Sequence, residues 1–336
     1  ALLLWFVWQT SAVLPPFLGG LAIAYLLDPV TDRLEARGWK RWIATTFVLV
    51  VFFALFAGLI LLIAPLLVSQ LTALIESLPV LIATLRPLAE RLYAEANVLV
   101  DLEGATDDLL QRVAGMATGV LRGVLEQGLA FFNVLALLVI MPVVAFYSLR
   151  DFDLLTAKMR GWIPPRFETR TSRLLEEMDN ALAGFIRGQF LVCSALAVFY
   201  AAGWWLTGLE FALVLGLIAG ILAFVPYLGA VISVVLALLV GLGQFGVDPL
   251  QLFFIFLVFQ IGQILEGSVL TPNLIGERIG LHPLWVLFAV FAGGELAGLW
   301  GVFLAVPVAA VIAVLVRAVM RAYLRSPLYG AEPEAE

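Results

Sequence analysis

Residues 211–242 read FALVLGLIAGILAFVPYLGAVISVVLALLVGL and contain no charged side chain. An α-helix rises about 1.5 Å per residue, so one straight helix over this stretch would measure about 48 Å. The hydrocarbon layer of a membrane is only about 30 Å thick. A proline and a glycine lie near the centre of the stretch, within FVPYLG at 224–229. The sequence therefore predicts two shorter helices that are joined at FVPYLG.

The composition of the whole chain also indicates a protein that lies in a membrane. Of its 336 residues, 63% are hydrophobic and 13% are charged, and the mean hydropathy is +1.06. A typical soluble domain is roughly half apolar and a quarter charged. The apolar runs are continuous, whereas the strands of a membrane β-barrel would alternate over about 10 residues. We therefore predict an all-α, polytopic integral membrane protein.

Further apolar runs and the polar segments between them predict how the chain is organised. Residues 2–27 are uncharged and interrupted at Pro15–Pro16, which leaves open one kinked helix or two helices. The predicted segments are N-terminal transmembrane helices within 1–68, an amphipathic helical extracytoplasmic domain at 69–128, a transmembrane helix at 129–147, a cytoplasmic amphipathic linker at 148–187, a C-terminal transmembrane bundle at 188–320 and a tail at 321–336.

A second long apolar run, 284–316, divides in the same way at AGGELAG (292–298). The strings GLIAGILAFVP (216–226) and GLWGVFLAVP (298–307) share two glycines ahead of a terminal proline, which suggests a repeated broken element of the kind found in secondary transporters. The alternative is that small residues simply let helices pack closely. The predicted hinge and broken-helix positions are Pro226, Gly229, Pro272, Gly293, Gly294 and Pro307.

The distribution of lysine and arginine predicts the orientation, because basic loops stay in the cytoplasm. Lys and Arg gather at 28–41, at 148–187 and after residue 316. These segments are expected inside the cell, and 69–128 outside. With two hairpins in the last third, the loop at 267–282 and the C-terminus are also expected inside.

Two carboxylates occur where a charge is costly, since a charge at mid-membrane costs about 2.5–3.5 kcal/mol on insertion scales. Glu266 ends the apolar run 250–265 and shares a helical face with Gln263. Glu295 lies inside the second broken segment. Each has a simpler explanation: Glu266 as a carboxylate that reaches interfacial water, and Glu295 as a polar hairpin tip in water.

Several functional classes lack the residues that they need. The chain has one histidine, His282, and one cysteine, Cys193, so neither a metal cluster nor Ser–His chemistry is expected. No phosphate-binding loop or GxSxG string occurs, and no basic run suggests nucleic acid. We expect a protein that is not an enzyme and has no cofactor.

Five stretches resemble the AI-2E transporter family. They are PPFLGGLAIAYLLDPVTDRLEARG (15–38), FIRGQF (185–190), GLIAGILAFVPYLGA (216–230), EGSVLTPNLIGERIGLHP (266–283) and GGELAGLWGVFLAVPVAAV (293–311). The most specific string consists of Pro272, Gly276, Gly280, Leu281 and Pro283. The resemblance runs from about residue 13 to 320 and is weakest over 69–128.

This resemblance implies a bacterial inner-membrane transporter with about seven or eight helices, two of them broken. It also implies a homo-oligomer, with a pentamer as the suggested architecture, and two helices within 1–27. The family is named for export of the quorum-sensing signal autoinducer-2, and it also contains proteins described as permeases and as sodium/proton antiporters.

Three functions follow as hypotheses. The first is export of a small polar metabolite such as autoinducer-2, bound by Gln263, Glu266, Asn273 and Tyr227 with backbone opened at Pro226 and Pro272. The second is Na⁺(Li⁺)/H⁺ antiport, in which Glu266 or Glu295 alternates between proton and cation. The third is an envelope scaffold whose 69–128 domain binds partners.

Overall fold

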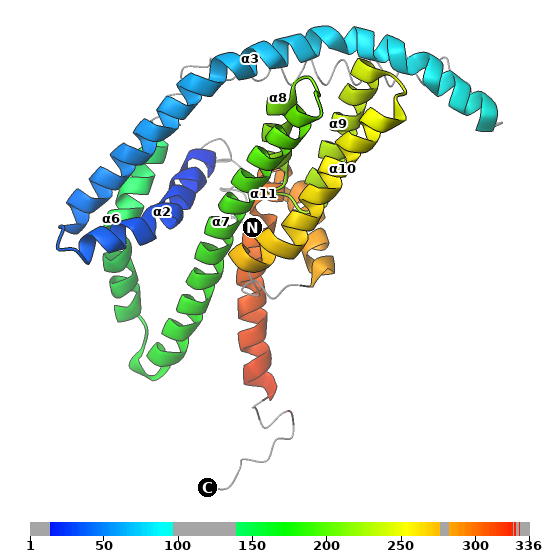
Figure 1. Ribbon diagram of the computed structural model, residues 1–336. Helices are drawn as coiled ribbons and strands as arrows, with labels where there is room; N and C mark the ends of the chain where they lie inside the picture. Colours follow the sequence, from blue (N-terminus) through cyan, green and yellow to red (C-terminus); the bar gives the residue numbers. More distant parts are fainter. Residues whose placement is uncertain (1–13, 97–138, 276–281, 325, 327–328, 330–336) are drawn as a thin grey trace. The chain divides into compact units, whose positions relative to one another are not determined.

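The computed structural model describes residues 14–96, 139–275, 282–324, 326 and 329, and all regular secondary structure in these ranges is helical (Figure 1). Five of the described helices are long and apolar enough to cross a membrane: Arg41–Gln70, Pro165–Leu206, Leu228–Phe245, Pro249–Ile275 and Gly301–Leu324. Two shorter apolar helices are Ala212–Leu222 and Pro283–Gly298. The predicted all-α polytopic membrane protein is confirmed.

The helices fall into two compact units. The first holds α2 (Leu14–Glu35), the start of α3 (Arg41–Ala96), α6 (Met141–Gly161), the first part of α7 (Pro165–Leu206) and α11 (Pro283–Leu324). The second holds the rest of α3 and α7 with α8 (Ala212–Leu222), α9 (Leu228–Phe245) and α10 (Pro249–Leu265). The π-helix η3 (Glu266–Ile275) follows α10 directly.

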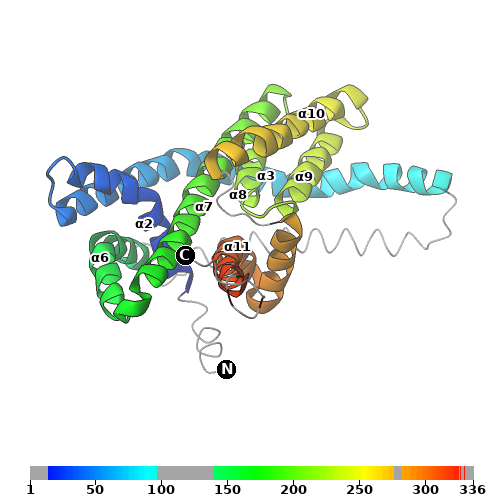
Figure 2. The ribbon, with the colours of Figure 1, turned by 90° about the horizontal axis from the view of Figure 1, so that it is seen from below.

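Within the first unit, α2 and α6 pack side by side (Figures 1 and 2). A β-carbon on Gly20 would lie 2.8 Å from the carbonyl oxygen of Met141 and 2.7 Å from the β-carbon of Val144. The missing side chain therefore allows the two helix backbones to approach closely, as small residues do between membrane helices.

The long helix α3 shows no break where the polar segment was predicted to begin. It continues from the apolar part through residue 69 to Ala96, so this predicted boundary is a change of composition within one helix. All of the predicted 69–128 domain after Ala96 and residues 129–138 of the predicted helix 129–147 lie outside the described residues, whereas residues 141–147 form the beginning of α6. Only 11% of the most apolar window of α3 is buried, and Leu55, Leu61 and Leu62 are 70–77% exposed.

The helix α7 likewise joins two segments that the sequence suggested were separate. It runs without interruption from Pro165 to Leu206, across the predicted boundary between Arg187 and Gly188. The amphipathic first part and the apolar second part both favour helix, and a change of polarity alone does not end one. The chain turns between Gly161 and Pro165, where two prolines, Pro164 and Pro165, follow each other.

The first broken element is a helical hairpin (Figure 1). α8 ends at Leu222 and α9 begins at Leu228, so the predicted division within FVPYLG is confirmed. Tyr227 has a left-handed φ of 65°, and a β-carbon on the buried Gly229 would collide with the carbonyl of Leu222. The two arms are unequal: α9, with 18 residues, is long enough to cross a membrane, whereas α8 has 11.

The second hairpin lies within α11, where Ala297 and Gly298 have non-helical dihedral angles and Gly298 has a φ of 57°. The predicted break within AGGELAG is therefore confirmed. β-carbons on Gly293 and Gly301 would each collide with the backbone carbonyl of the other, and one on Gly294 would lie 3.2 Å from Val302. Figures 1 and 2 show the orange first arm beside the red second arm.

The structure corrects two details of the proposed repeat. Pro307 is buried inside the second arm of α11, and the non-helical dihedral angles of α11 are at Ala297 and Gly298, so Pro307 does not break the helix. GLIAGILAFVP ends in the turn of the first hairpin, at Pro226, whereas GLWGVFLAVP starts at the kink of the second, at Gly298. The two strings therefore occupy different positions relative to the break and do not form an internal repeat in register.

The backbone after Leu265 also differs from the predicted proline-broken turn. It continues as η3 through Pro272 to Ile275. In an α-helix a proline ring clashes with the carbonyl four residues earlier, and the wider π-turn relieves this crowding. Residues Gly276 to Leu281 of the family-specific string lie outside the described residues.

Candidate functional site

The candidate site lies in the second unit, where α7 packs against α10. Gly262 on α10 leaves room for the ring of Tyr200, into which a β-carbon would collide. Tyr200 is buried and stacks on Trp204 with ring centroids 4.9 Å apart. The indole nitrogen of Trp204 in turn donates a hydrogen bond of 3.2 Å to the carbonyl oxygen of Ile255. The aromatic contacts thus fix the position of the Tyr200 hydroxyl.

Three polar side chains meet at this hydroxyl, and we call them the Tyr200 cluster: Tyr200, Gln263 and Glu266. The Gln263 amide nitrogen Nε2 donates to the hydroxyl oxygen of Tyr200 at 3.2 Å. The same nitrogen donates to Oε2 of Glu266 at 3.3 Å. One amide group therefore bridges a phenol on α7 and a carboxylate at the start of η3.

The cluster keeps hydrogen-bonding capacity for a ligand. Because Tyr200 accepts from Gln263, its own proton remains available for donation, and the second carboxylate oxygen of Glu266 can accept. Among the described residues, no lysine or arginine forms an ion pair with the half-buried Glu266. An acceptor with this character suits either a hydroxyl group or a cation.

The backbone at the cluster is unusual as well. The π-helical register begins at Glu266 and extends to Ile275. Such wide turns are rare and are often found at functional sites, because they reposition side chains relative to an α-helix. The backbone at Glu266 is therefore irregular through a π-helix and not through the predicted break at Pro272.

The other predicted ligand residues lie elsewhere. Tyr227 is 54% exposed at the turn between α8 and α9, and the described hydrogen bonds do not connect it to the Tyr200 cluster. Asn273 is exposed near the end of η3. Glu295 is exposed on the first arm of α11, three residues before the kink at Gly298. Asn273 and Glu295 belong to the first unit, so their part in the site remains a prediction.

Sequence reasoning missed Tyr200. The residue lies in the apolar run 188–207, where a tyrosine resembles another packing aromatic. The available signal was chemical: a buried tyrosine hydroxyl usually has a hydrogen-bond partner. Its partner, Gln263, is 63 residues away in the sequence, and only the packing of α7 on α10 brings the two together.

The FIRGQF string, by contrast, has a structural role in the first unit. Arg187 donates through Nε to the carbonyl oxygen of Tyr25 at 2.8 Å, and the Tyr25 hydroxyl donates to Asp179 at 2.8 Å. A β-carbon on Gly188 would lie 2.7 Å from the carbonyl oxygen of Leu274. The string therefore connects α7 to α2 and to the end of η3.

The first family-like stretch also contains a structural network, which we call the Arg41 network. Arg41 forms ion pairs with Asp28 at 3.0 Å, with Glu35 at 2.8 Å and with Asp32. Its Nε donates to the carbonyl oxygen of Leu149 at 3.0 Å. Arg41 thereby joins α2, the start of α3 and α6.

Comparisons with known proteins agree with these observations. The family model described as AI-2E family transporter matches residues 1–321. YrrI of Bacillus subtilis (strain 168), named as a candidate transport protein, is 30% identical over 317 residues, which cover 93% of this chain and 87% of YrrI. PerM of Escherichia coli (strain K12), named as a candidate permease, is 30% identical over 311 residues, or 92% of this chain and 88% of PerM. The helical hairpins, the membrane-spanning helices and these matches together show that the chain belongs to the AI-2E family of transporters.

Proposed function

We propose that this membrane transport protein is a secondary transporter that exports a small polar metabolite, with autoinducer-2 as the example suggested by the family name. The observation that supports this most is the Tyr200 cluster. A hydroxyl-rich solute needs donors and acceptors in a place shielded from competing water, and the cluster offers a phenol, an amide and a carboxylate at the start of η3.

The test is the substitution Glu266→Gln, which keeps the shape of the side chain and removes its negative charge. Cells or vesicles loaded with labelled autoinducer-2 should show slower efflux with this variant at equal membrane expression. The exposed Glu210→Gln, which makes the same chemical change away from the cluster, is the matched control. Unchanged efflux in Glu266→Gln would remove Glu266 from the site.

A second candidate function is Na⁺(Li⁺)/H⁺ antiport. It is favoured by a specific observation, namely that the Glu266 carboxylate is half-buried and has an amide rather than a cation as its hydrogen-bond partner. A carboxylate of this kind can exchange a proton for an alkali cation. Proteoliposomes should then show proton flux that depends on Na⁺ or Li⁺ and is lost in Glu266→Gln. Efflux of autoinducer-2 without any cation dependence would favour the exporter.

We also propose the cellular setting that the family suggests: the bacterial inner membrane, with a cytoplasmic C-terminus, and a homo-oligomer that is a pentamer. The exposed apolar side chains of α3 are compatible with lipid or subunit contacts. The mass of the purified protein in detergent, with the detergent contribution subtracted, tests the oligomer. If the protein is instead an envelope scaffold, deleting 69–128 should abolish its phenotype while substitution of Glu266 should have no effect.

A further inference from the structure

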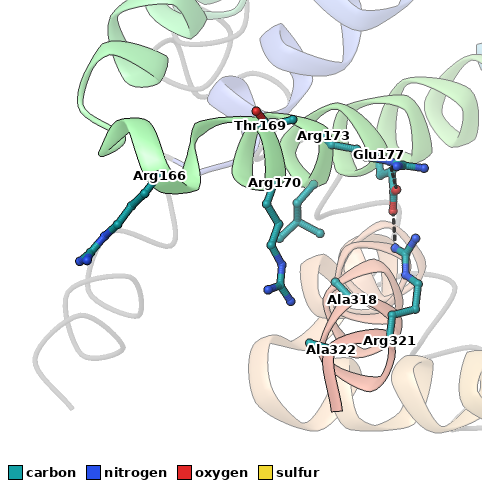
Figure 3. A pocket seen from close by; sticks show the side chains of 9 residues that line it. Arg166, Thr169, Arg170, Arg173, Glu177, Ala318, Arg321 and Ala322 are labelled. Carbon is teal, nitrogen blue, oxygen red and sulfur yellow. Dashed lines mark hydrogen bonds and ion pairs between the residues drawn. The ribbon is translucent and has the colours of Figure 1, made fainter. Parts of the chain in front are cut away.

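A cavity in the described part of the first unit lies between the beginning of α7 and the end of α11. It measures about 660 Å³, and we call it the arginine groove (Figure 3). Its α7 wall carries Arg166, Thr169, Arg170, Arg173, Leu174 and Glu177. Its α11 wall carries Ala318, Arg321 and Ala322.

The groove is strongly positive, because four arginines face one carboxylate. Glu177 accepts from Arg321 at 2.8 Å and lies 3.5 Å from Arg173, so it holds an arginine on each helix in a fixed position. Arg166 lies over the ring of Phe167 at 4.7 Å. Arg170 extends from α7 toward α11 in Figure 3, and it forms no ion pair with another described residue.

The two helices give the groove its shape and its room. On α11, the residues opposite Arg170 are the alanines Ala318 and Ala322, whose small side chains leave the space open (Figure 3). A guanidinium presents several N–H donors in a planar fork that matches the oxygens of a phosphate. The charge and the donor geometry therefore favour an anionic ligand such as a phosphate group over a neutral one.

The surroundings indicate that the ligand comes from the membrane. Arg317 directly follows the apolar part of α11, and Arg321 lies one turn further on. Between them, Val319 and Met320 are exposed. Across the groove, Phe167 is exposed and the nearby Trp162 is 81% exposed. Aromatic and long basic side chains concentrate where a membrane meets water. A site for a freely dissolved anion would not require this apolar border.

We propose that the arginine groove binds the phosphate headgroup of an anionic membrane phospholipid, whose acyl chains lie along the apolar part of α11. Basic pockets between membrane helices bind such headgroups in general, and each arginine near the surface strengthens the attraction. Glu177 orients the guanidinium of Arg321. Arg166 and Arg170, with which Glu177 forms no ion pair, supply positive charge for the phosphate.

The experiment uses the full-length protein in mixed micelles with phosphatidylglycerol, and native mass spectrometry counts the lipids that stay bound. The double variant Arg166→Gln/Arg170→Gln should weaken phosphatidylglycerol binding by about 30-fold and lower its dependence on salt. Phosphatidylcholine, which has no net charge, should bind weakly to both proteins. Arg170→Gln alone, at an exposed position, carries the test should the double variant not fold.

The matched control is Arg37→Gln/Lys40→Gln, which removes two exposed positive charges outside the groove. Its phosphatidylglycerol binding should equal that of the wild type. An equal loss in the control would show that general surface charge binds the lipid and would overturn the proposal. Competition by inorganic phosphate as effective as that by phosphatidylglycerol would overturn the lipid assignment in favour of a dissolved anion.

Discussion

The side chain of Tyr200 combines two interactions that can be separated experimentally. Its ring is stacked with the rings of Trp204 and Phe259, whose centroids lie 4.9 Å and 6.4 Å away. Its hydroxyl accepts the hydrogen bond from Gln263 that also positions the amide for Glu266. Loss of the hydroxyl alone should therefore disturb the cluster and leave the packing intact.

Tyr200→Phe tests this separation. The ring contacts remain, so the free energy of unfolding should fall by only about 1 kcal/mol, the net value of one hydrogen bond. Transport should decrease clearly more, because Gln263 loses the anchor that orients it toward Glu266. Vesicle efflux and thermal unfolding in detergent measure the two effects. Tyr147→Phe, at an exposed tyrosine on α6, is the control, and equal transport in both variants would contradict a role for the hydroxyl.

At the residue scale, the sequence predicted two of the three members of the candidate site. Gln263 and Glu266 are three residues apart, so helical periodicity alone places them on one face, and the structure confirms their contact. Tyr200 depends on the packing of two helices that are distant in sequence, which no local pattern encodes. The predicted hinge at Pro307 was wrong, because α11 continues through this proline. Whether a proline is accommodated inside a helix depends on its surroundings, which the local sequence does not show.

At the scale of elements, the two hairpins depend on glycines that permit backbone contact. Their existence was predictable because helix length and membrane thickness are both fixed by geometry, and 211–242 exceeds the thickness. The continuity of α3 and α7 was not predictable in this way, because polarity changes along each helix without a change of backbone. The π-helix at Pro272 escaped prediction because sequence patterns distinguish a proline break from a widened helix poorly.

Gly293→Ala should destabilise the second hairpin. The added methyl group would meet the carbonyl of Gly301 on the other arm, and overpacking of this kind costs about 1–3 kcal/mol. Thermal unfolding in detergent measures the change. The control is Gly58→Ala on α3, where nothing lies within contact distance of the new methyl group and helix propensity predicts a gain of up to about 1 kcal/mol. Equal effects in both variants would contradict the close contact of the two arms.

Gly188→Ala should loosen the contact between α7 and the end of η3. The new methyl group would lie 2.7 Å from the Leu274 carbonyl oxygen, so the helices must move apart. We expect faster backbone hydrogen exchange around Leu274 than in the wild type, measured by mass spectrometry. Gly267→Ala, also on η3 but facing open space, should leave exchange there unchanged. Unaltered exchange in Gly188→Ala would show that the contact does not restrain η3.

At the scale of the whole molecule, the Arg41 network makes three helices of the first unit depend on one side chain. Arg41 is only 16% exposed, while its carboxylate partners are 29–56% exposed. Without the guanidinium, three neighbouring carboxylates would face one another and the Leu149 carbonyl would lose its donor. Solvent screens part of this repulsion because the carboxylates are partly exposed.

Arg41→Gln should accordingly lower the free energy of unfolding by about 2 kcal/mol, in the range for hydrogen bonds to charged groups. Arg41→Lys keeps the charge but loses the planar fork that reaches several partners, so its effect should be intermediate. Thermal unfolding in detergent at low and high salt measures both, and added salt should reduce the cost in Arg41→Gln. Stability equal to the wild type in Arg41→Gln would show that the network does not hold the helices together.

The sparse packing of α3 has a consequence for how the protein is made. A helix with 11% of its most apolar window buried receives little stability from neighbouring side chains. In a dry hydrocarbon layer, however, its own amide–carbonyl bonds have no water to compete with them, and each is worth about 4–6 kcal/mol relative to being unpaired. We therefore expect the segment Arg41–Gln70 to keep its helix in the membrane without help from neighbouring helices. Its insertion would then not depend on the later joining of helices at their glycine contacts.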